Sequence, residues 1–301
     1  MSTYIEVLHS HSWDAVAEAR KCSQIEDFFS LIRTGKIQEL KAHIRKHPEA
    51  VLYTNNLREN ALHIAVKAQQ PEILKVILDS LPENISKEDK DRFINQRNSE
   101  GFSALMVCAV QKSTDCARLL MPHHPNLLIE GYDIQRNVMH LAAECNADEI
   151  LRMVLSEKDE NGKPILNPNQ VCANSFKKFG YAPLHLAASS RAEKSAAVLI
   201  ELGADINMPA TANHQSLGKT PLMIALEAKS FDIVKLFLKN EKIDLTRKDI
   251  HGNVAYHYAK RHTFMLDFIE ALKVNLLDHT KINSVSKHDD KKHIDTQHTV
   301  V

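Results

Sequence analysis

Four histidines occupy the same place in a recurring phrase, and histidine is the side chain best suited to metal binding or proton transfer near neutral pH. They are His63, His140, His185 and His257, and the phrase in full reads Pro-Leu-His-Leu-Ala-Ala at 183–188. One histidine per copy implies neighbours about 10 Å apart. That is too far for a shared metal ion, whose nitrogen ligands lie at about 2.0–2.1 Å. We therefore predict a structural role, in which each ring ties its turn to the next one by hydrogen bonds.

No other group of residues predicts a catalytic or metal site. His123 and His124 precede Pro125 at the end of an expected helix, where the helix dipole favours histidine. Evenly spaced histidines in the polar tail make a poor metal site: His288, His293 and His298. The sequence contains no nucleophile-elbow, phosphate-loop, zinc-protease or dinucleotide motif, and only eight glycines. We expect a protein that is not an enzyme and that holds no cofactor and no metal.

The composition limits the partners and the compartment. Because 38 Lys and Arg balance 38 Asp and Glu, we expect no general attraction to nucleic acid. The five cysteines are odd in number and include no Cys-x-x-Cys pair, which indicates reduced thiols in a reducing compartment. The sequence shows neither a signal peptide nor the roughly 18 apolar residues of a membrane helix. These features predict a monomer of the cytoplasm, the nucleus or both, with no direct nucleic-acid binding and no membrane contact.

The elements that position the histidines follow from the period of the phrase. Its leucine slot recurs six times, at Leu62, Leu105, Met139, Leu184, Leu222 and Tyr256. The slots at 105 and 139, and those at 222 and 256, are 34 residues apart. A period near 33 residues with this phrase resembles the ankyrin repeat, in which each copy forms two antiparallel helices and a projecting turn. A stack of such units builds a recognition surface rather than a catalytic cleft.

The expected fold is an all-α ankyrin solenoid of about seven helix–turn–helix units with projecting turns, in which the first and last units are degenerate. Residues 1–24 form an N-terminal segment that is expected to be helical, and residues 273–301 form a disordered polar tail. Residues 25–272 form the repeat array. Its units are expected near 25–56, 57–96, 97–129, 130–175, 176–213, 214–247 and 248–272.

Two insertions lengthen the intervals between copies. Residues 82–93 contain a run of six charged residues, and residues 156–168 contain Gly162, Pro164 and Pro168. Both are expected to be loops placed where they leave the stacking of repeats undisturbed. A solvated spacer and a binding loop remain alternatives for each.

One stretch resembles a particular ankyrin family. The segment Asn55-Asn56-Leu57-Arg58-Glu59-Asn60-Ala61-Leu62-His63-Ile64-Ala65-Val66, with Gln70-Pro71-Glu72-Ile73 after it, is similar to the second repeat of the inhibitor-of-NF-κB (IκB) family. The sequence departs from that family because it lacks the Asp-Ser-Gly-x-x-Ser degradation signal, an acidic Pro- and Ser-rich tail and the phrase in its first repeat. The resemblance therefore implies a member that persists, rather than one that is degraded on stimulation.

The resemblance implies a non-catalytic regulator that binds Rel/NF-κB-type transcription factors, with a Rel-homology dimer as partner. Contacts are expected at the turns and on the exposed side of the inner helices. The turn positions are Asn55, Asn56, Arg58, Ser99, Glu100, Tyr132, Asp133, Lys177, Lys178 and Lys248. The inner-helix positions are Lys67, Gln69, Gln111, Lys112, Glu144, Arg191 and Lys229. The alternative is an ankyrin scaffold or adaptor with an unrelated protein partner, such as a host-mimicking effector or an adaptor tethered to a PDZ domain.

Two further positions carry open alternatives. Thr299 and the terminal Val301 match the C-terminal ending that PDZ domains capture at a sheet edge. The alternative is a tail that carries no binding signal. Asn207 lies in a segment that resembles the site at which an asparaginyl hydroxylase modifies ankyrin repeats. The other interpretation of Asn207 is a turn asparagine chosen for its backbone geometry.

Overall fold

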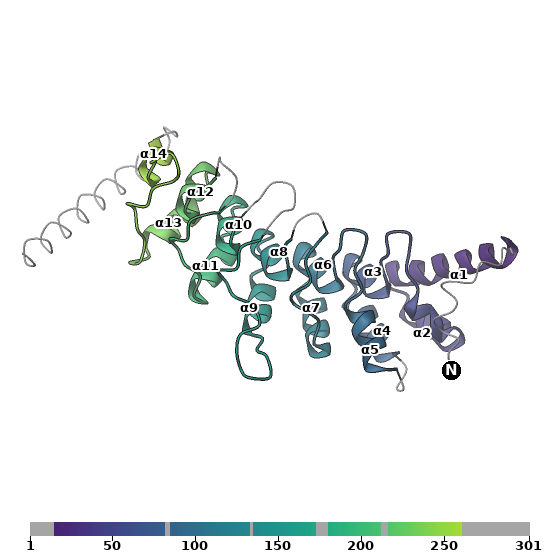
Figure 1. The fold of residues 1–301 in the computed structure, drawn as a ribbon. Coiled ribbons are helices and arrows are strands. Elements are labelled where there is room, and N and C mark those ends of the chain that lie inside the picture. The colour runs from purple at the N-terminus through teal and green to yellow at the C-terminus, as the bar shows by residue number, and fades with distance from the viewer. Residues whose placement is uncertain (1–14, 82–84, 133–134, 173–179, 212–215, 261–301) are drawn as a thin grey trace, which may run out of the picture. The chain divides into compact units, whose positions relative to one another are not determined.

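The computed structural model describes residues 15–81, 85–132, 135–172, 180–211 and 216–260, which fold into helices joined by turns (Figure 1). Within these ranges there is no β-strand and only three isolated β-bridges. The chain forms two compact units, Met1–Asn126 and Leu127–Val301, which we call the N-terminal and C-terminal units. None of the helices in the described ranges is both long and apolar enough to cross a membrane.

The N-terminal unit consists of helix pairs joined by short turns. Helix α3 packs against both its partner α4 and the next inner helix α6, and α4 packs against α7. Its helices are α1 (Ala15–Arg33), α2 (Ile37–Lys46), α3 (Ala61–Lys67), α4 (Pro71–Asp79), α5 (Lys87–Ile94), α6 (Ala104–Gln111) and α7 (Thr114–Leu120), with 3-10 turns at Pro48–Leu52 and Met121–His123.

The C-terminal unit repeats this plan. The inner helices α8, α10, α12 and α14 pack in succession, and so do the outer helices α9, α11 and α13. Their bounds are α8 (Val138–Glu144), α9 (Asp148–Ser156), α10 (Pro183–Ser189), α11 (Glu193–Glu201), α12 (Pro221–Glu227), α13 (Phe231–Leu238) and α14 (Ala255–Lys260). The expected all-α array of repeated helix pairs is confirmed within each unit.

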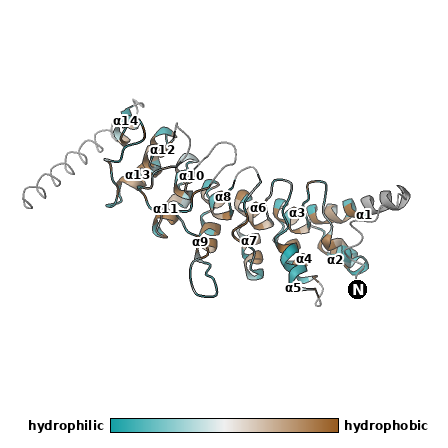
Figure 2. Cartoon of the chain, viewed as in Figure 1, coloured by the Kyte–Doolittle hydropathy of each residue, from teal (hydrophilic) through white to brown (hydrophobic). Residues whose placement is uncertain are grey.

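Four inner helices begin at a residue that caps the helix N-terminus, and the inner helices pack against one another through small residues. Asn60, Ser103, Asn137 and Thr220 each accept backbone N–H bonds at a helix start. Buried alanines on the inner helices allow close helix approach, as at Ala65. Figure 2 shows hydrophobic residues on helices such as α9 and α13, and hydrophilic residues in the connecting turns and on the charged helix α5.

The first helix pair, α1 and α2, buries apolar side chains on either side of Gly35. Phe28, Phe29 and Ile32 of α1 and Leu40 of α2 are buried. The expected boundary between residues 24 and 25 falls inside α1, because Ala15–Arg33 contains no Gly or Pro that would interrupt a helix.

The first insertion is not the loop predicted from the sequence. Residues 87–94 form helix α5, which begins at Ser86, whose Oγ accepts the Asp89 N–H at 3.0 Å. The helix buries Phe93 and Ile94 at its end, and the Asn60 side chain donates to the Phe93 carbonyl at 2.9 Å. The prediction of a loop was wrong because the charged run 87–92 shows no apolar period that would indicate a helix. One cap, Ser86, and two buried residues, Phe93 and Ile94, are enough to form this short helix.

The second insertion is a loop, as expected, and it is internally hydrogen-bonded. The Asp159 N–H donates to the Lys163 carbonyl at 2.8 Å, and the Asp159 carboxylate accepts the backbone N–H groups of Asn161 and Lys163 at 2.9 Å each. Gly162 has a φ of +75°, which closes this turn. Leu166 is buried at the base of the loop.

Candidate functional site

The projecting turns are held by one side chain placed seven residues before the leucine slot. The Asn55 Oδ1 accepts the N–H groups of Leu57 and Glu59 at 2.9 Å each, and Asn98 does the same for the next turn. Asp249 repeats the arrangement in the C-terminal unit with the N–H groups of His251 and Asn253. These bonds organise the tips before any partner is present.

Three of the motif histidines are buried and tie neighbouring turns together, as predicted. The Nε2 of His63 lies 2.9 Å from the carbonyl of Phe102, that of His140 lies 2.9 Å from Gln170, and that of His185 lies 2.9 Å from Met208. Because a carbonyl only accepts, each Nε2 donates the proton. The fourth, His257, is exposed, and its Nδ1 accepts the Val254 N–H at 3.1 Å.

Burial keeps these rings neutral. It lowers the pKa of His140 and of His185 to about 4, although the carbonyl bonds act in the opposite direction. The pKa of His63 is lowered for the same reason. Among the residues that the structure describes, no group of His, Cys, Asp or Glu is placed to hold a metal ion. Their burial and their bonds to neighbouring turns give His63, His140 and His185 a structural role in this fold.

An ion pair locks the projecting turn onto its inner helix in three repeats. The pairs are Glu59–Lys67, Arg136–Glu144 and Lys219–Glu227. In each pair the first residue lies three residues before the leucine slot and the second lies five residues after it. The first residue is acidic in the Glu59–Lys67 pair and basic in the other two pairs. The sequence carried this signal as an eight-residue spacing of opposite charges, which the sequence-based prediction did not use.

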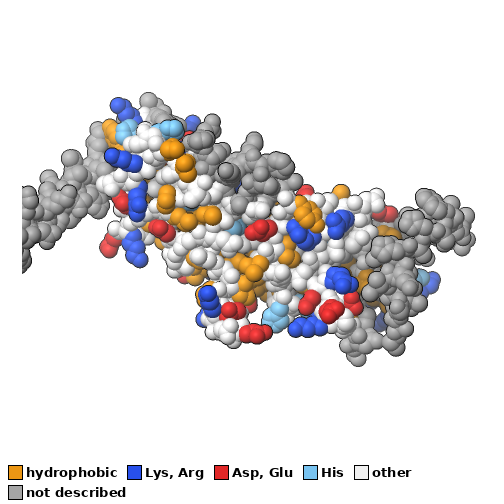
Figure 3. Space-filling view, in the orientation of Figure 1, with side chains coloured by type: hydrophobic (Ala, Val, Ile, Leu, Met, Phe, Trp, Pro, Cys, Tyr) orange, Lys and Arg blue, Asp and Glu red, His pale blue; other side chains and the backbone are white. Residues whose placement is uncertain are grey.

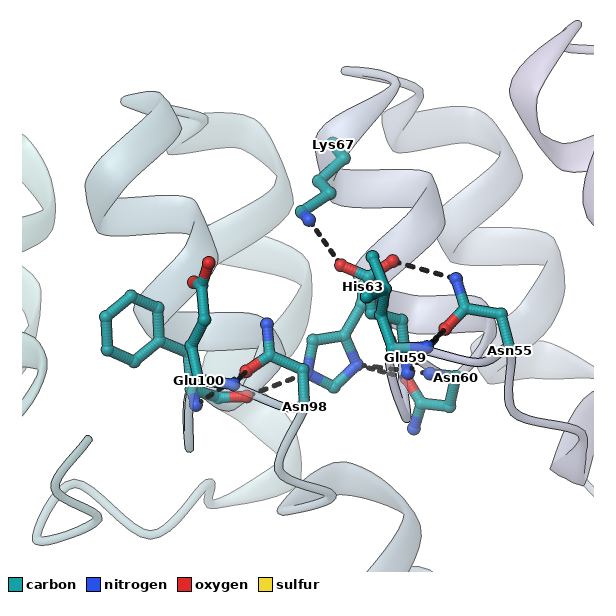
Figure 4. Close-up of polar contacts among 9 residues, drawn as sticks. Asn55, Glu59, Asn60, His63, Lys67, Asn98 and Glu100 are labelled. Atoms are coloured by element: carbon teal, nitrogen blue, oxygen red, sulfur yellow. Dashed lines mark hydrogen bonds and ion pairs between the residues drawn. The ribbon is translucent and has the colours of Figure 1, made fainter. Parts of the chain in front are cut away.

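Figure 4 shows the first of these locks. The Glu59 side chain is only 4% exposed and is paired with Lys67 on α3, and the Asn55 Nδ2 donates to its Oε2 at 2.9 Å. Burial alone would raise the pKa of Glu59, but the hydrogen bonds from Lys67 and Asn55 outweigh it and lower that pKa. Lys67 and Asn55, both predicted as contacts, thus also hold the turn in place.

Most of the described residues predicted to contact a partner are exposed. These are Asn56, Arg58, Lys67, Gln69, Ser99, Glu100, Gln111, Lys112, Tyr132, Arg191, Lys229 and Lys248. Asn55 and Glu144 are half-buried. Asp133, Lys177, Lys178, Thr299 and Val301 lie outside the described residues. Figure 3 shows acidic, basic and hydrophobic side chains interspersed over the described residues of the face drawn.

Four of the positions predicted on inner helices lie just beyond them. Gln69, Lys112, Arg191 and Lys229 have φ values of +52° to +58°, and each stands seven residues after the leucine slot. The left-handed conformation ends the helix there, as glycine commonly does. For a residue with a Cβ this conformation costs about 1 kcal/mol or more relative to glycine. Asn146 occupies the same position with a φ of +58°.

Stacked helix pairs with preorganised turns and varied exposed side chains define a repeat protein whose surface serves protein–protein interaction. The chain belongs to the ankyrin repeat family: the family model for three ankyrin repeats matches residues 31–127 and 124–210, and that for a single ankyrin repeat matches residues 217–250.

Two solved structures share this fold, and one curated relative aligns with most of the chain. The human ASB11 ankyrin repeat domain has a TM-score of 0.61 at 18% identity, covering 82% of this chain and 96% of that one. The ankyrin repeat domain of Bcl-3, described as a unique member of the IκB family, has a TM-score of 0.60 at 18% identity, covering 82% and 97%. The NF-κB p105 subunit of Gallus gallus is 23% identical over 246 residues, which are 81% of this chain and 22% of p105.

Proposed function

We propose that this chain is a non-catalytic, IκB-like regulator that binds Rel/NF-κB-type transcription factors in the cytoplasm or nucleus. The observation that carries the proposal is the alignment with NF-κB p105, which runs over 81% of this chain. Because the chain spans about a fifth of that relative, the alignment supports a shared repeat region and not the activity of the whole protein. The Asn55–Ile73 phrase supports the same assignment.

The turn tips of the N-terminal unit supply a suitable contact surface. The Ser99 N–H donates to the Leu57 carbonyl at 2.8 Å, so two adjacent tips are fixed relative to each other. Leu57 is 53% exposed beside the exposed Arg58, although the sequence-based contact set did not include it. Arginine is one of the residue types enriched in interface hot spots, and Leu57 adds exposed apolar area beside Arg58 on a preorganised turn.

The proposal is tested by calorimetric titration of the full chain against a panel of Rel-homology dimers. We expect submicromolar binding to at least one dimer and a loss of at least tenfold in affinity for the Arg58→Glu/Lys112→Glu variant, because both cations are exposed in the N-terminal unit. The matched control is Lys75→Glu, an exposed lysine on α4, the second helix of the same repeat.

Absence of binding to every dimer would refute the proposal. An equal loss in the Lys75→Glu control would show that net charge, rather than the turn surface, carries the interaction. Binding of an unrelated partner that is lost on removal of residues 281–301 would favour the scaffold or adaptor function.

A further inference from the structure

Two neighbouring projecting turns in the C-terminal unit are in direct contact. The Ile250 N–H donates to the Leu217 carbonyl at 3.1 Å. Gly218 makes this approach possible, because a Cβ added there would come within 3.1 Å of both the Asp249 Cα and the Ile250 nitrogen. Its φ of +82° also favours glycine. The two turn tips therefore form one surface, to which adjacent repeats each contribute an apolar residue.

The second of these turns is held in place by its own aspartate. The Asp249 Oδ1 accepts the N–H groups of His251 and Asn253 at 2.8 Å each. Its Oδ2 accepts the Tyr258 hydroxyl at 2.5 Å and the Asn253 Nδ2 at 3.1 Å. Tyr258 is buried on α14, so the turn is tied to the inner helix that follows it. A turn held in this way loses little conformational entropy when a partner binds.

The tip of this turn is apolar. Ile250 is 50% exposed, and Leu217 on the neighbouring tip is half-buried. A single exposed apolar side chain is ordinary on a protein surface. Here, however, the bonds at Asp249 and at the Leu217 carbonyl fix the backbone on both sides of the contact, so Ile250 cannot turn inward without breaking them. The exposed apolar area is therefore available to a partner at a fixed position.

The unneutralised charge beside the tip is positive. Lys248 is exposed and makes no ion pair with any residue that the structure describes. The two acidic residues nearest to it in the chain are already engaged, since Asp244 pairs with Arg247 at 3.1 Å and Asp249 makes the four bonds given above. Figure 3 shows hydrophobic, basic and histidine side chains close together near α12 and α14.

We propose that the Leu217–Ile250 turn tips bind a protein segment that presents an apolar side chain with a carboxylate beside it. Ile250 contacts the apolar side chain, and the Lys248 ammonium pairs with the carboxylate. A nucleic-acid strand fits less well, because it needs a row of cations along its phosphates. The inference rests on the proposed function only for the source of the segment, which we assign to the Rel-type partner.

Two variants and two matched controls test this surface. Ile250→Ser removes the exposed apolar area, and Lys248→Glu reverses the unpaired charge. Ile165→Ser makes the first change at another exposed isoleucine of the same unit, and Lys239→Glu makes the second at an exposed lysine just after α13. Because all four side chains are exposed, we expect the Tm of each variant to stay within about 2 °C of wild type.

Fluorescence anisotropy of the full chain with labelled twelve-residue peptides measures the binding. The peptides are four repeats of Glu-Leu-Ser, of Glu-Ala-Ser or of Gln-Leu-Ser. We expect the Glu-Leu-Ser peptide to bind most tightly, and at least tenfold more weakly to Ile250→Ser and to Lys248→Glu, with both controls unchanged. Ile250→Ser should not weaken binding of Glu-Ala-Ser, which offers no large apolar side chain. Equal affinity of wild type and Ile250→Ser for Glu-Leu-Ser would overturn the site.

Two other occupants of the tips are outcomes of the same set of variants. Self-association of the wild type in sedimentation velocity, abolished by Ile250→Ser, would assign the tips to a second copy of this chain and overturn the proposal. Tighter binding of a twelve-residue oligothymidylate than of any peptide, lost in Lys248→Glu, would assign the surface to nucleic acid and also overturn it.

The Rel-dimer titration distinguishes failure of this surface from failure of the proposed function. A dimer that binds wild type at least tenfold more tightly than Ile250→Ser carries the segment, as proposed. A dimer that binds both equally overturns the assignment of the segment to the Rel partner, while the proposed function stands. If no dimer binds but the Glu-Leu-Ser peptide does, the proposed function falls and the binding surface is supported.

Discussion

Lowering the pH from 7.5 to 5 is expected to destabilise the C-terminal unit by about 4 kcal/mol. His140 and His185 have folded-state pKa values of about 4 because they are buried, against an ordinary value of 6.5. Their lowered pKa means that the stability they contribute is fully present above pH 6.5 and is lost as the pH falls from 6.5 towards 4. By linkage, each histidine removes about 2 kcal/mol of unfolding free energy at pH 5.

Urea denaturation at a series of pH values measures this effect. The His140→Gln/His185→Gln variant should show a shallower dependence of unfolding free energy on pH between 5 and 7, since the glutamine amide does not titrate. The imidazole resonances of wild type should stay those of the neutral ring down to pH 5. An unchanged pH dependence in the double variant would contradict the assignment of the acid sensitivity to these two rings.

The variant Lys67→Met is expected to reduce the unfolding free energy by about 2 kcal/mol at pH 7. It leaves the Glu59 carboxylate buried without its cation, and breaking a buried pair is strongly destabilising. The half-exposed lysine reduces that penalty, because water reaches its end of the pair. Without Lys67, the pKa of Glu59 should rise from its lowered value. The variant should therefore regain part of its lost stability as the pH falls and the carboxylate is protonated.

Two controls isolate the buried charge in this experiment. The Glu59→Gln/Lys67→Met variant removes both charges and should recover most of the loss, because no buried carboxylate remains. Lys36→Met breaks the Lys36–Glu39 pair, in which both side chains are more than half exposed, and should change stability very little. If Lys36→Met lowers the unfolding free energy as much as Lys67→Met does, burial of the Glu59 carboxylate is not the cause of the destabilisation.

The helix pairs could be predicted because each depends on local signals that recur. Pro183 at the first position of α10 and Gly203 just after α11 are signals of this kind. Helix α5 could not be predicted in the same way, because its stability depends on Phe93 and Ile94 reaching the core. Periodicity detects a stripe along a helix, and α5 is too short and too charged to show one.

The sequence predicted which turn residues are exposed, but not which of them are buried or hydrogen-bonded within the turn. The sequence placed Arg58 and Lys112 on exposed turns, where the structure also finds them. It gave no indication that the Asn55 side chain makes its hydrogen bonds within its own turn, or that the Glu59 carboxylate is buried. These properties depend on which groups face each other after folding, and an ion pair across eight residues needs the turn to fold back on its helix first.

The motif histidines have a consequence for how such a chain can change in length. The Nε2 of each of the three buried rings bonds to a backbone carbonyl in the segment that leads to the next inner helix. Every residue type offers that carbonyl, so the bond sets no requirement on the neighbour's sequence. A duplicated or exchanged repeat would find its acceptor already present, and recombination could lengthen or reshuffle the array while each junction keeps its bond.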